Sequence, residues 1–208
     1  MGEFAADRDR LVRTLASRED VDAATLEAMR AVPREAFLPA ERRDRAYADT
    51  PLPIGEGQTI SAPHMVAVMT SLLDLEPGMD VLEIGTGRGY HAAVTADVVG
   101  AGHVHTVEYH DRLAAAARRR LAETGYGAVS VRTGDGKRGW PAHAPYDRAY
   151  LTCAAEEVPD AVLDQVRPGG LLLAPVGSRH QTLVRLRKRA DGRLEREDHG
   201  GVRFVPLQ

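Results

Sequence analysis

One stretch decides the fold of this chain: Asp80–Tyr90, which reads DVLEIGTGRGY. A short apolar run there ends in three glycines at alternate positions, and an alanine-rich, helix-forming segment follows. This order predicts a strand, a tight turn and the start of a helix, the arrangement in which a parallel sheet binds a nucleotide-like ligand at the carboxyl ends of its strands. Glycine suits such a turn because it adopts positive φ angles and lets a ligand approach bare backbone.

Strands and helices alternate on both sides of this stretch. We expect strands at 81–84, 103–108, 129–132, 147–152 and 171–175, and helices at 65–75, 90–99, 111–123 and 159–166. Two further strands, within 181–189 and 193–207, flank Asp191-Gly192, a strong signal for a hairpin turn. The pattern predicts an α/β fold with a Rossmann-like, mostly parallel, doubly wound sheet that ends in an antiparallel hairpin. The loops after the first four strands then meet at one edge, where a ligand binds.

The region before residue 63 follows a different pattern. Residues 4–31 predict two short helices, the second of them capped by Asp20 or Asp22. The proline- and glycine-rich segment 34–63 predicts a long irregular loop whose apolar residues let it pack, which is typical of a functional segment. We expect a single domain over 1–208, with N-terminal helices and this loop at 1–62 and a Rossmann-like core at 63–208.

Composition narrows the possible partners. The 208 residues carry a formal net charge of −3, so the sequence shows no electrostatic footprint of a nucleic-acid-binding protein. It contains no apolar run of about 18 residues and no secretory signal, which predicts a cytoplasmic protein without a membrane partner. Cys153 is the only cysteine, so no intrachain disulfide is expected. His103, His105 and His110 are closely spaced, but no carboxylate or cysteine is placed to complete a metal site, and none is expected.

Three acidic residues near the strand ends identify the kind of ligand. Glu108 ends the second predicted core strand, 23 residues after Gly85, where a carboxylate accepts hydrogen bonds from both hydroxyls of a ribose. This acid suits a nicotinamide dinucleotide equally well, but the G-x-G-x-G spacing differs from the G-x-G-x-x-G of dinucleotide sites. Asp135, between two glycines after the third core strand, suits an adenine amino group, although Asp-Gly is also ordinary turn chemistry. Together with Glu83, these residues predict a site for S-adenosylmethionine.

The chain also resembles the protein-L-isoaspartate O-methyltransferase family over nearly its whole length. The segments that carry this resemblance are 32–34, 37–39, 47–49, 51–55, 57–65, 81–90, 134–136, 144–147, 166–170 and 202–207. Residues 58–61, which read QTIS, are the part most specific to this family. The resemblance implies a class I S-adenosylmethionine-dependent methyltransferase fold with added N-terminal helices. It also implies methylation of the free carboxylate of L-isoaspartyl residues in damaged proteins and peptides, with S-adenosyl-L-homocysteine as the second product.

The resemblance further implies roles for individual residues. Ser61 matches the active-site serine, with Thr59 beside it at the substrate and Val205 in the substrate cleft. In this family a segment closes over the cofactor, and the residues of this chain that correspond to it are Gln58, Thr59, Ile60 and His64. The resemblance assigns Gly85, Thr86 and Gly87 to the binding of the cofactor's methionine portion. It assigns Glu108 to the ribose, and Asp135 with Gly136 to the adenine.

Other interpretations remain open from the sequence. Ser61 also suits the N-cap of the helix that follows it. One alternative is a carboxyl methyltransferase dedicated to one peptide or protein partner. Another is a regulator that binds the cofactor without catalysis, but the retention of Ser61 and of the whole loop argues against it. A nucleic-acid methyltransferase is disfavoured because the chain lacks a base-flipping motif and a basic surface. Glu156-Glu157 and Arg88 depart from the family pattern near the predicted cleft, and we expect the protein to act as a monomer.

Overall fold

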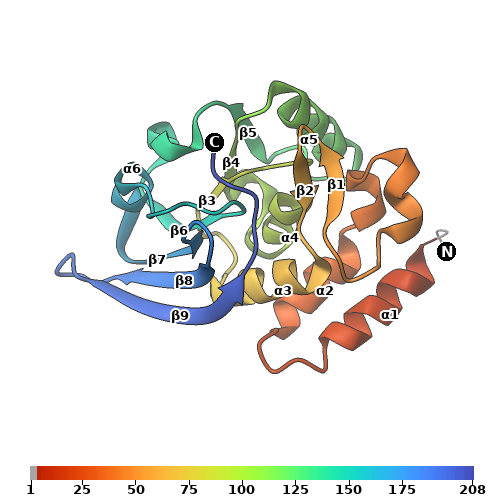
Figure 1. The fold of residues 1–208 in the computed structure, drawn as a ribbon, viewed down its shortest axis with the longest axis horizontal. Coiled ribbons are helices and arrows are strands. Elements are labelled where there is room, and N and C mark those ends of the chain that lie inside the picture. Colours follow the sequence, from red (N-terminus) through yellow and green to blue (C-terminus); the bar gives the residue numbers. More distant parts are fainter. Residues whose placement is uncertain (1–3) are drawn as a thin grey trace.

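The computed structural model describes residues 4–208, and a seven-stranded sheet forms its centre (Figure 1). The strand order is β5-β4-β3-β6-β7-β8-β9, with parallel pairing from β5 to β7 and antiparallel pairing from β7 to β9. The strands are β3 (Val81–Ile84), β4 (Val104–Glu108), β5 (Ser130–Thr133), β6 (Tyr146–Leu151), β7 (Val166–Val176), β8 (Gln181–Lys188) and β9 (Leu194–Val202). The predicted fold class, a mostly parallel sheet with a terminal antiparallel hairpin, is confirmed.

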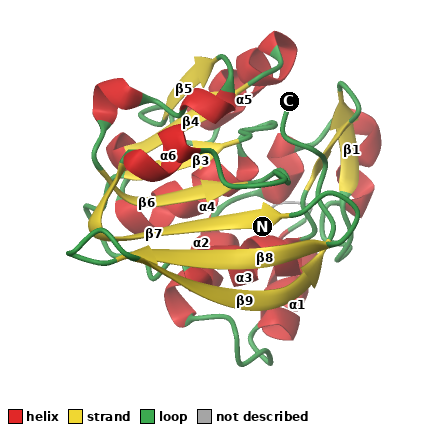
Figure 2. Cartoon of the chain, turned by 60° about the vertical axis from the view of Figure 1, so that its left-hand side comes forward, coloured by secondary structure: helices red, strands yellow, loops and turns green. Residues whose placement is uncertain are grey.

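Helices cover both faces of this sheet (Figure 2). They are α1 (Ala5–Leu15), α2 (Ala23–Ala31), α3 (Pro63–Leu72), α4 (Tyr90–Val99), α5 (Asp111–Glu123) and α6 (Asp160–Asp164). The first five pack into one hydrophobic cluster with Val81 and Val104 of the sheet. On the opposite face, α6 packs with Leu82 and Ile84 in a second cluster. Side chains of successive strand residues point to opposite faces, so β3 contributes to both clusters. Among residues 4–208, none of the helices combines the length and apolar character needed to cross a bilayer.

Boundaries differ from the predictions mainly at the ends of elements. Asp22 caps α2 by accepting a hydrogen bond from the Thr25 backbone N–H at 2.7 Å, as one of the two predicted candidates. The α5 helix has the predicted bounds, with His110 at its N-cap position and Asp111 in its first turn. The α6 helix ends earlier than expected, because β7 already begins at Val166.

The largest difference lies in segment 34–63, where the prediction of an irregular loop was wrong. The segment contains two 3-10 helices, η1 (Arg34–Phe37) and η2 (Ala40–Arg45), and an antiparallel hairpin of β1 (Leu52–Gly55) and β2 (Gln58–Ile60). Side chains along β1 alternate between buried and exposed, which is a strand pattern hidden by the prolines at alternate positions. Its turn has positive φ at Gly55, Glu56 and Gly57, and the two glycines allow this tight reversal.

Two arginines attach the N-terminal segment to the glycine turn of residues 85–89. Arg88 Nε donates a hydrogen bond to the Phe37 carbonyl oxygen at 2.8 Å. Arg34 is fully buried, donates from Nε to the Ala46 carbonyl oxygen at 2.8 Å, and places its guanidinium 5.0 Å from the centre of the Tyr90 ring. Such a cation–π contact compensates part of the cost of burying the charge. The segment before residue 63 is therefore fixed against the same turn that the sequence singled out.

Candidate functional site

The glycine turn between β3 and α4 has little space for side chains. Gly85, Gly87 and Gly89 have φ angles of 97°, 57° and 96°. A Cβ at Gly85 would overlap the Thr152 hydroxyl, and a Cβ at Gly87 would lie 3.1 Å from the Ile54 side chain. Thr152 in turn donates a hydrogen bond to the Gly85 carbonyl oxygen at 2.5 Å. The bare backbone of this turn thus fits between the end of β6 and the β1–β2 hairpin.

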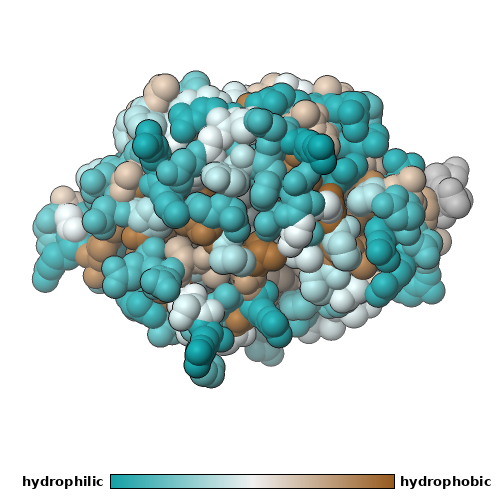
Figure 3. Space-filling model, turned by 45° about the horizontal axis from the view of Figure 1, so that its top comes forward, coloured by the Kyte–Doolittle hydropathy of each residue, from teal (hydrophilic) through white to brown (hydrophobic). Residues whose placement is uncertain are grey.

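A cavity of about 530 Å³, which we call the edge cavity, lies beside this turn. It is bounded by Gln58 of the hairpin, by Gly85 and Glu108 at strand ends, by Gly136 and by Leu207. Apolar patches gather in the middle of one face of the molecule and are surrounded by polar residues (Figure 3). A partly apolar cavity with a few polar groups at the carboxyl ends of parallel strands suits a nucleoside.

Glu108 forms part of the wall of the edge cavity, where two backbone N–H groups hold its carboxylate. One carboxylate oxygen accepts a hydrogen bond from the Gly87 backbone N–H at 2.7 Å, and the other accepts from the His110 N–H at 2.9 Å. The residue is 5% exposed. Both oxygens are therefore held in one orientation at the cavity wall, and each keeps a free lone pair for a hydroxyl group.

Two further hollows adjoin the edge cavity. The smaller one, of about 330 Å³, lies over Thr86, Gly87 and Tyr90, and we call it the inner cavity. The larger is an open cleft of about 2110 Å³ between the start of α3 and the C-terminal segment. Thr59, Ser61 and Thr152 line both the inner cavity and the cleft. Three side-chain hydroxyls thus stand where the two spaces meet.

Ser61 is free to act at this junction because it does not cap a helix. The N-cap position of α3 is Ala62, without a side-chain cap hydrogen bond, and Pro63 occupies the first turn. The interpretation of Ser61 as a helix cap is therefore wrong. Pro63 itself has no N–H, and the N–H of the next residue, His64, donates to an Asp49 carboxylate oxygen at 2.9 Å, so Asp49 takes the place of a capping residue.

The other residues of the predicted closing segment divide between the three spaces. Gln58 lines the edge cavity, and its amide nitrogen lies 3.4 Å from the His110 ring. Ile60 lines the inner cavity and is otherwise buried. His64 lines only the cleft, where both its backbone N–H and its Nδ1 lie 2.9 Å from an oxygen of Asp49. His64 is thus placed on the cleft side, away from the two cavities.

Of the remaining predicted residues, Gly136 and Val205 line the edge cavity, whereas Asp135 lines none of the three spaces. Gly136 lines the edge cavity, and a Cβ there would overlap Ile84. Asp135 caps the short helix η4 (Gly136–Arg138) by accepting from the Lys137 N–H at 2.9 Å, and its side chain stays partly exposed. Val205 lines both the edge cavity and the cleft.

Glu83 is not part of any cavity wall. It is fully buried and accepts hydrogen bonds from the Thr106 hydroxyl at 2.5 Å and the Tyr150 hydroxyl at 2.8 Å. Thr106 lies 2.6 Å from the hydroxyl of Thr86, which lines the inner cavity. Burial, with a smaller contribution from the charge of Glu108, raises the pKa of Glu83 to about 7, although the two hydrogen bonds oppose the shift. Any influence of Glu83 on a ligand passes through the two threonines.

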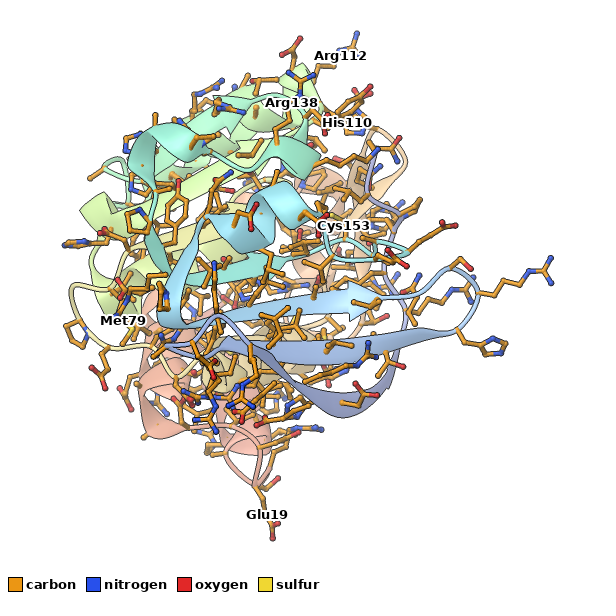
Figure 4. All side chains as sticks on the ribbon, turned by 90° about the vertical axis from the view of Figure 1, so that its left-hand side faces the viewer. Glu19, Met79, His110, Arg112, Arg138 and Cys153 are labelled. Atoms are coloured by element: carbon orange, nitrogen blue, oxygen red, sulfur yellow. The ribbon has the colours of Figure 1, made fainter. Side chains whose placement is uncertain are left out.

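The sequence did not identify several residues that line the two cavities and the cleft. Thr152 was assigned only as the end of a strand, and yet it lines all three spaces. Leu207 reaches the edge cavity because the chain end pairs with Ala154: Ala154 N–H donates to the Val205 oxygen and Leu207 N–H to the Ala154 oxygen, both at 2.8 Å. Cys153 and His110 also line this cavity and lie at the same edge of the molecule (Figure 4). Burial raises the pKa of the Cys153 thiol to about 12, so it stays neutral.

The closely spaced histidines occupy separate environments. His103 Nδ1 lies 2.9 Å from an oxygen of Asp80, whereas the His105 ring stacks on His143 with ring centres 4.0 Å apart. His110 borders the edge cavity. Within residues 4–208, no group of three or more histidine, cysteine, aspartate or glutamate side chains is arranged to hold a metal ion.

Comparisons with known proteins agree on one family. The sequence model described as "Protein-L-isoaspartate(D-aspartate) O-methyltransferase" matches residues 6–208. A protein-L-isoaspartate O-methyltransferase of Methanopyrus kandleri is 52% identical over 208 residues, which cover 98% of this chain and 92% of the relative. The protein-L-isoaspartate O-methyltransferase 2 of Archaeoglobus fulgidus is 47% identical over 207 residues, covering 99% and 94% of the two chains.

Solved structures agree with the sequence comparison. A structure named protein-L-isoaspartate O-methyltransferase superposes with a TM-score of 0.89 at 31% identity, over 97% of this chain and 66% of the other. A structure from Plasmodium falciparum, named as a putative protein-L-isoaspartate O-methyltransferase in complex with S-adenosyl-L-homocysteine, superposes with a TM-score of 0.84 over 97% of this chain and 98% of the other. Its 21% identity supports the shared fold alone.

The packing at Gly85 predicts an unequal effect of two alanine substitutions. Gly85 and Gly78 both have positive φ, 97° and 85°, but a Cβ at Gly78 meets nothing within 4 Å, whereas one at Gly85 overlaps Thr152. Backbone strain is expected to cost about 1 kcal/mol in either variant, and the overlap to add about 1–3 kcal/mol in Gly85→Ala. Thermal unfolding measures both, and an equal loss of Tm would contradict the packing argument.

The buried carboxyl of Glu83 predicts a pH-dependent effect of Glu83→Gln. Its folded-state pKa, about 7, lies above the ordinary value of 4.5, so the stabilisation linked to its protonation is present below pH 4.5 and is lost as pH rises through 7. A neutral amide does not titrate. The free energy of unfolding of the variant relative to the original protein should therefore rise by roughly 1–3 kcal/mol between pH 5 and pH 8.

Denaturant unfolding across this pH range tests the effect of Glu83→Gln, with the exposed Glu76→Gln as control. The control should differ from the original protein by the same amount at every pH. A difference for Glu83→Gln that does not change with pH would show that the carboxyl keeps its ordinary pKa in the folded state.

Proposed function

Because the chain belongs to the protein-L-isoaspartate(D-aspartate) O-methyltransferase family, we propose that it methylates the free carboxylate of L-isoaspartyl residues in damaged proteins and peptides with S-adenosyl-L-methionine as donor. One structural observation supports the proposal in addition to family membership. The inner cavity at the glycine turn meets an open cleft at the hydroxyls of Thr59, Ser61 and Thr152, and Thr59 and Thr152 also line the edge cavity. A methyl transferase needs such a junction, because donor and acceptor enter from separate spaces.

The walls of the two cavities suit the cofactor. Glu108 presents two fixed carboxylate oxygens for the ribose hydroxyls. Gly136 leaves room for the adenine, with Asp135 beside it, and the glycine turn with Thr86 receives the methionine portion. Gln58, Thr59 and Ile60 cover these parts from the hairpin, while His64 serves the substrate side in this proposal. When bound, the cofactor supplies a methyl group made electrophilic by its sulfonium sulfur.

The protein's task in the reaction is mainly positioning. A carboxylate with an ordinary pKa near 4 is ionised at neutral pH and needs no general base. Ser61 and Thr59 hold and orient the substrate carboxylate by hydrogen bonds, and Val205 forms the opposite wall. Such positioning brings the carboxylate oxygen into line with the methyl carbon.

The product explains why methylation begins a repair. In the methyl ester, the neighbouring backbone amide nitrogen attacks the ester carbonyl and methanol leaves, which gives a succinimide. Water opens this ring to aspartyl and isoaspartyl products, and the ring chemistry requires no protein group. In this proposal the enzyme acts as a cytoplasmic monomer on isoaspartyl proteins and peptides, without a nucleic-acid partner. The single cysteine is in keeping with a reducing compartment.

Transfer of a labelled methyl group tests the proposed activity. We expect transfer from S-adenosyl-L-methionine to an isoaspartyl peptide and not to its aspartyl twin. Several isoaspartyl peptides of unrelated sequence should react, since the cleft is open; reaction of only one would favour an enzyme dedicated to a single partner. Equal labelling of the twins would contradict the proposed substrate.

The position of Ser61 predicts a selective effect of Ser61→Ala. Loss of a hydrogen bond to a charged group should lower kcat about 10- to 100-fold. Cofactor affinity, measured by calorimetry with S-adenosyl-L-homocysteine, should change less than about twofold, because Ser61 lines the inner cavity only where it joins the cleft and lies outside the edge cavity, where the ribose and adenine are proposed to bind. Ser17→Ala, on the surface after α1, is the matched control. An equal loss of cofactor affinity would assign Ser61 to the cofactor instead.

A further inference from the structure

The charge of the cleft differs from that of the whole chain. The protein carries 30 acidic and 27 basic residues, a formal net charge of −3. Among residues 4–208, those that line the cleft include no aspartate and no glutamate, but they include Arg179 and Arg203; Asp49 lies behind this lining, 2.9 Å from His64. The opening that leads to Ser61 is thus locally positive on a molecule that is negative overall.

The side chains of Arg179 and Arg203 take no part in the polar contacts that stabilise the described part of the chain. Both are exposed, and neither forms a hydrogen bond or an ion pair with another residue of the 4–208 range. Neighbouring arginines of the β8–β9 hairpin behave differently: Arg185 pairs with Asp74 and Glu197, Arg189 with Glu195, and Arg196 with Asp198. Each of these three arginines thus forms an ion pair that stabilises the hairpin. The two arginines at the cleft have none within the described chain.

The backbones that carry these two arginines are held together. Arg179 lies in the turn between β7 and β8, and Arg203 directly follows β9. The Gln181 side chain accepts a hydrogen bond from the Phe204 N–H at 2.6 Å and donates one to the Phe204 oxygen at 3.1 Å. This pair of bonds fixes the two segments relative to each other. Both arginines therefore extend from fixed positions on one side of the cleft.

From this arrangement we infer that Arg179 and Arg203 set a substrate preference for isoaspartyl peptides with acidic residues next to the isoaspartate. The inference rests on the proposed function and deepens it. A peptide whose isoaspartyl carboxylate reaches Ser61 runs through the same cleft that the two arginines line. Exposed charges act over roughly 8–10 Å at ordinary ionic strength, which is the range of the neighbouring residues of a bound peptide. Charge complementarity of this kind contributes specificity and faster association.

Matched peptides test the preference. Three isoaspartyl hexapeptides, acetylated and amidated at their ends, carry Glu, Gln or Lys on both sides of the isoaspartate. We expect kcat/KM to be about 3- to 10-fold higher for the Glu peptide than for the Gln peptide, and lowest for the Lys peptide. The ratio between the Glu and Gln peptides should fall toward one as salt rises from about 0.05 M to 0.5 M.

Variants then assign the preference to the two arginines. In Arg179→Gln/Arg203→Gln, the ratio between the Glu and Gln peptides should fall to about one, while Arg13→Gln, an exposed arginine of α1, should keep the ratio of the original protein. A ratio of one in the original protein, or an unchanged ratio in the double variant, would overturn the inference. Methylation of the Gln peptide but not of its aspartyl twin would leave the proposed function intact in either case.

Discussion

The structure depends on one constraint, the close approach of the backbone at Gly85 to Thr152. With no side chain at residue 85, β3 can turn directly beneath the end of β6, and the Thr152 hydroxyl closes the contact with a 2.5 Å hydrogen bond to the Gly85 oxygen. The edge cavity, the inner cavity and the cleft all include Thr152 in their walls. A contact that shapes the turn therefore also determines where the three spaces meet.

Around this contact, polar groups from distant parts of the chain are held by backbone hydrogen bonds. Glu108 receives the N–H groups of Gly87 and His110, and Arg88 reaches the carbonyl oxygen of Phe37. The bonds made by Gly87 and Arg88 join the glycine turn to two different segments, the end of β4 and η1. The protein's own hydrogen bonds thus hold the site in one arrangement, and such preorganisation lowers the ordering cost of binding.

Much of this arrangement could be predicted from the sequence because the core follows regular patterns. The alternation of strands and helices from residue 63 onward specifies a parallel sheet, and strand ends of such a sheet meet at one edge, which brings Glu108, Gly85 and Gly136 together. The β1–β2 hairpin was missed because Pro51, just before β1, and Pro53, within it, mask the strand pattern, although burial still alternates there. Thr152 and Leu207 were missed for another reason: their place in the walls depends on tertiary pairing that no local pattern encodes.

The pairing of the last residues with Ala154 has a practical consequence for handling the protein. Val205 and Leu207 are held by backbone hydrogen bonds to Ala154, and Gln208 itself borders the edge cavity. A label attached to Gln208 would therefore stand at the mouth of the edge cavity. Residues of α1 do not line this cavity, so an exposed position of that helix, such as Arg13, is the better place for surface attachment or labelling.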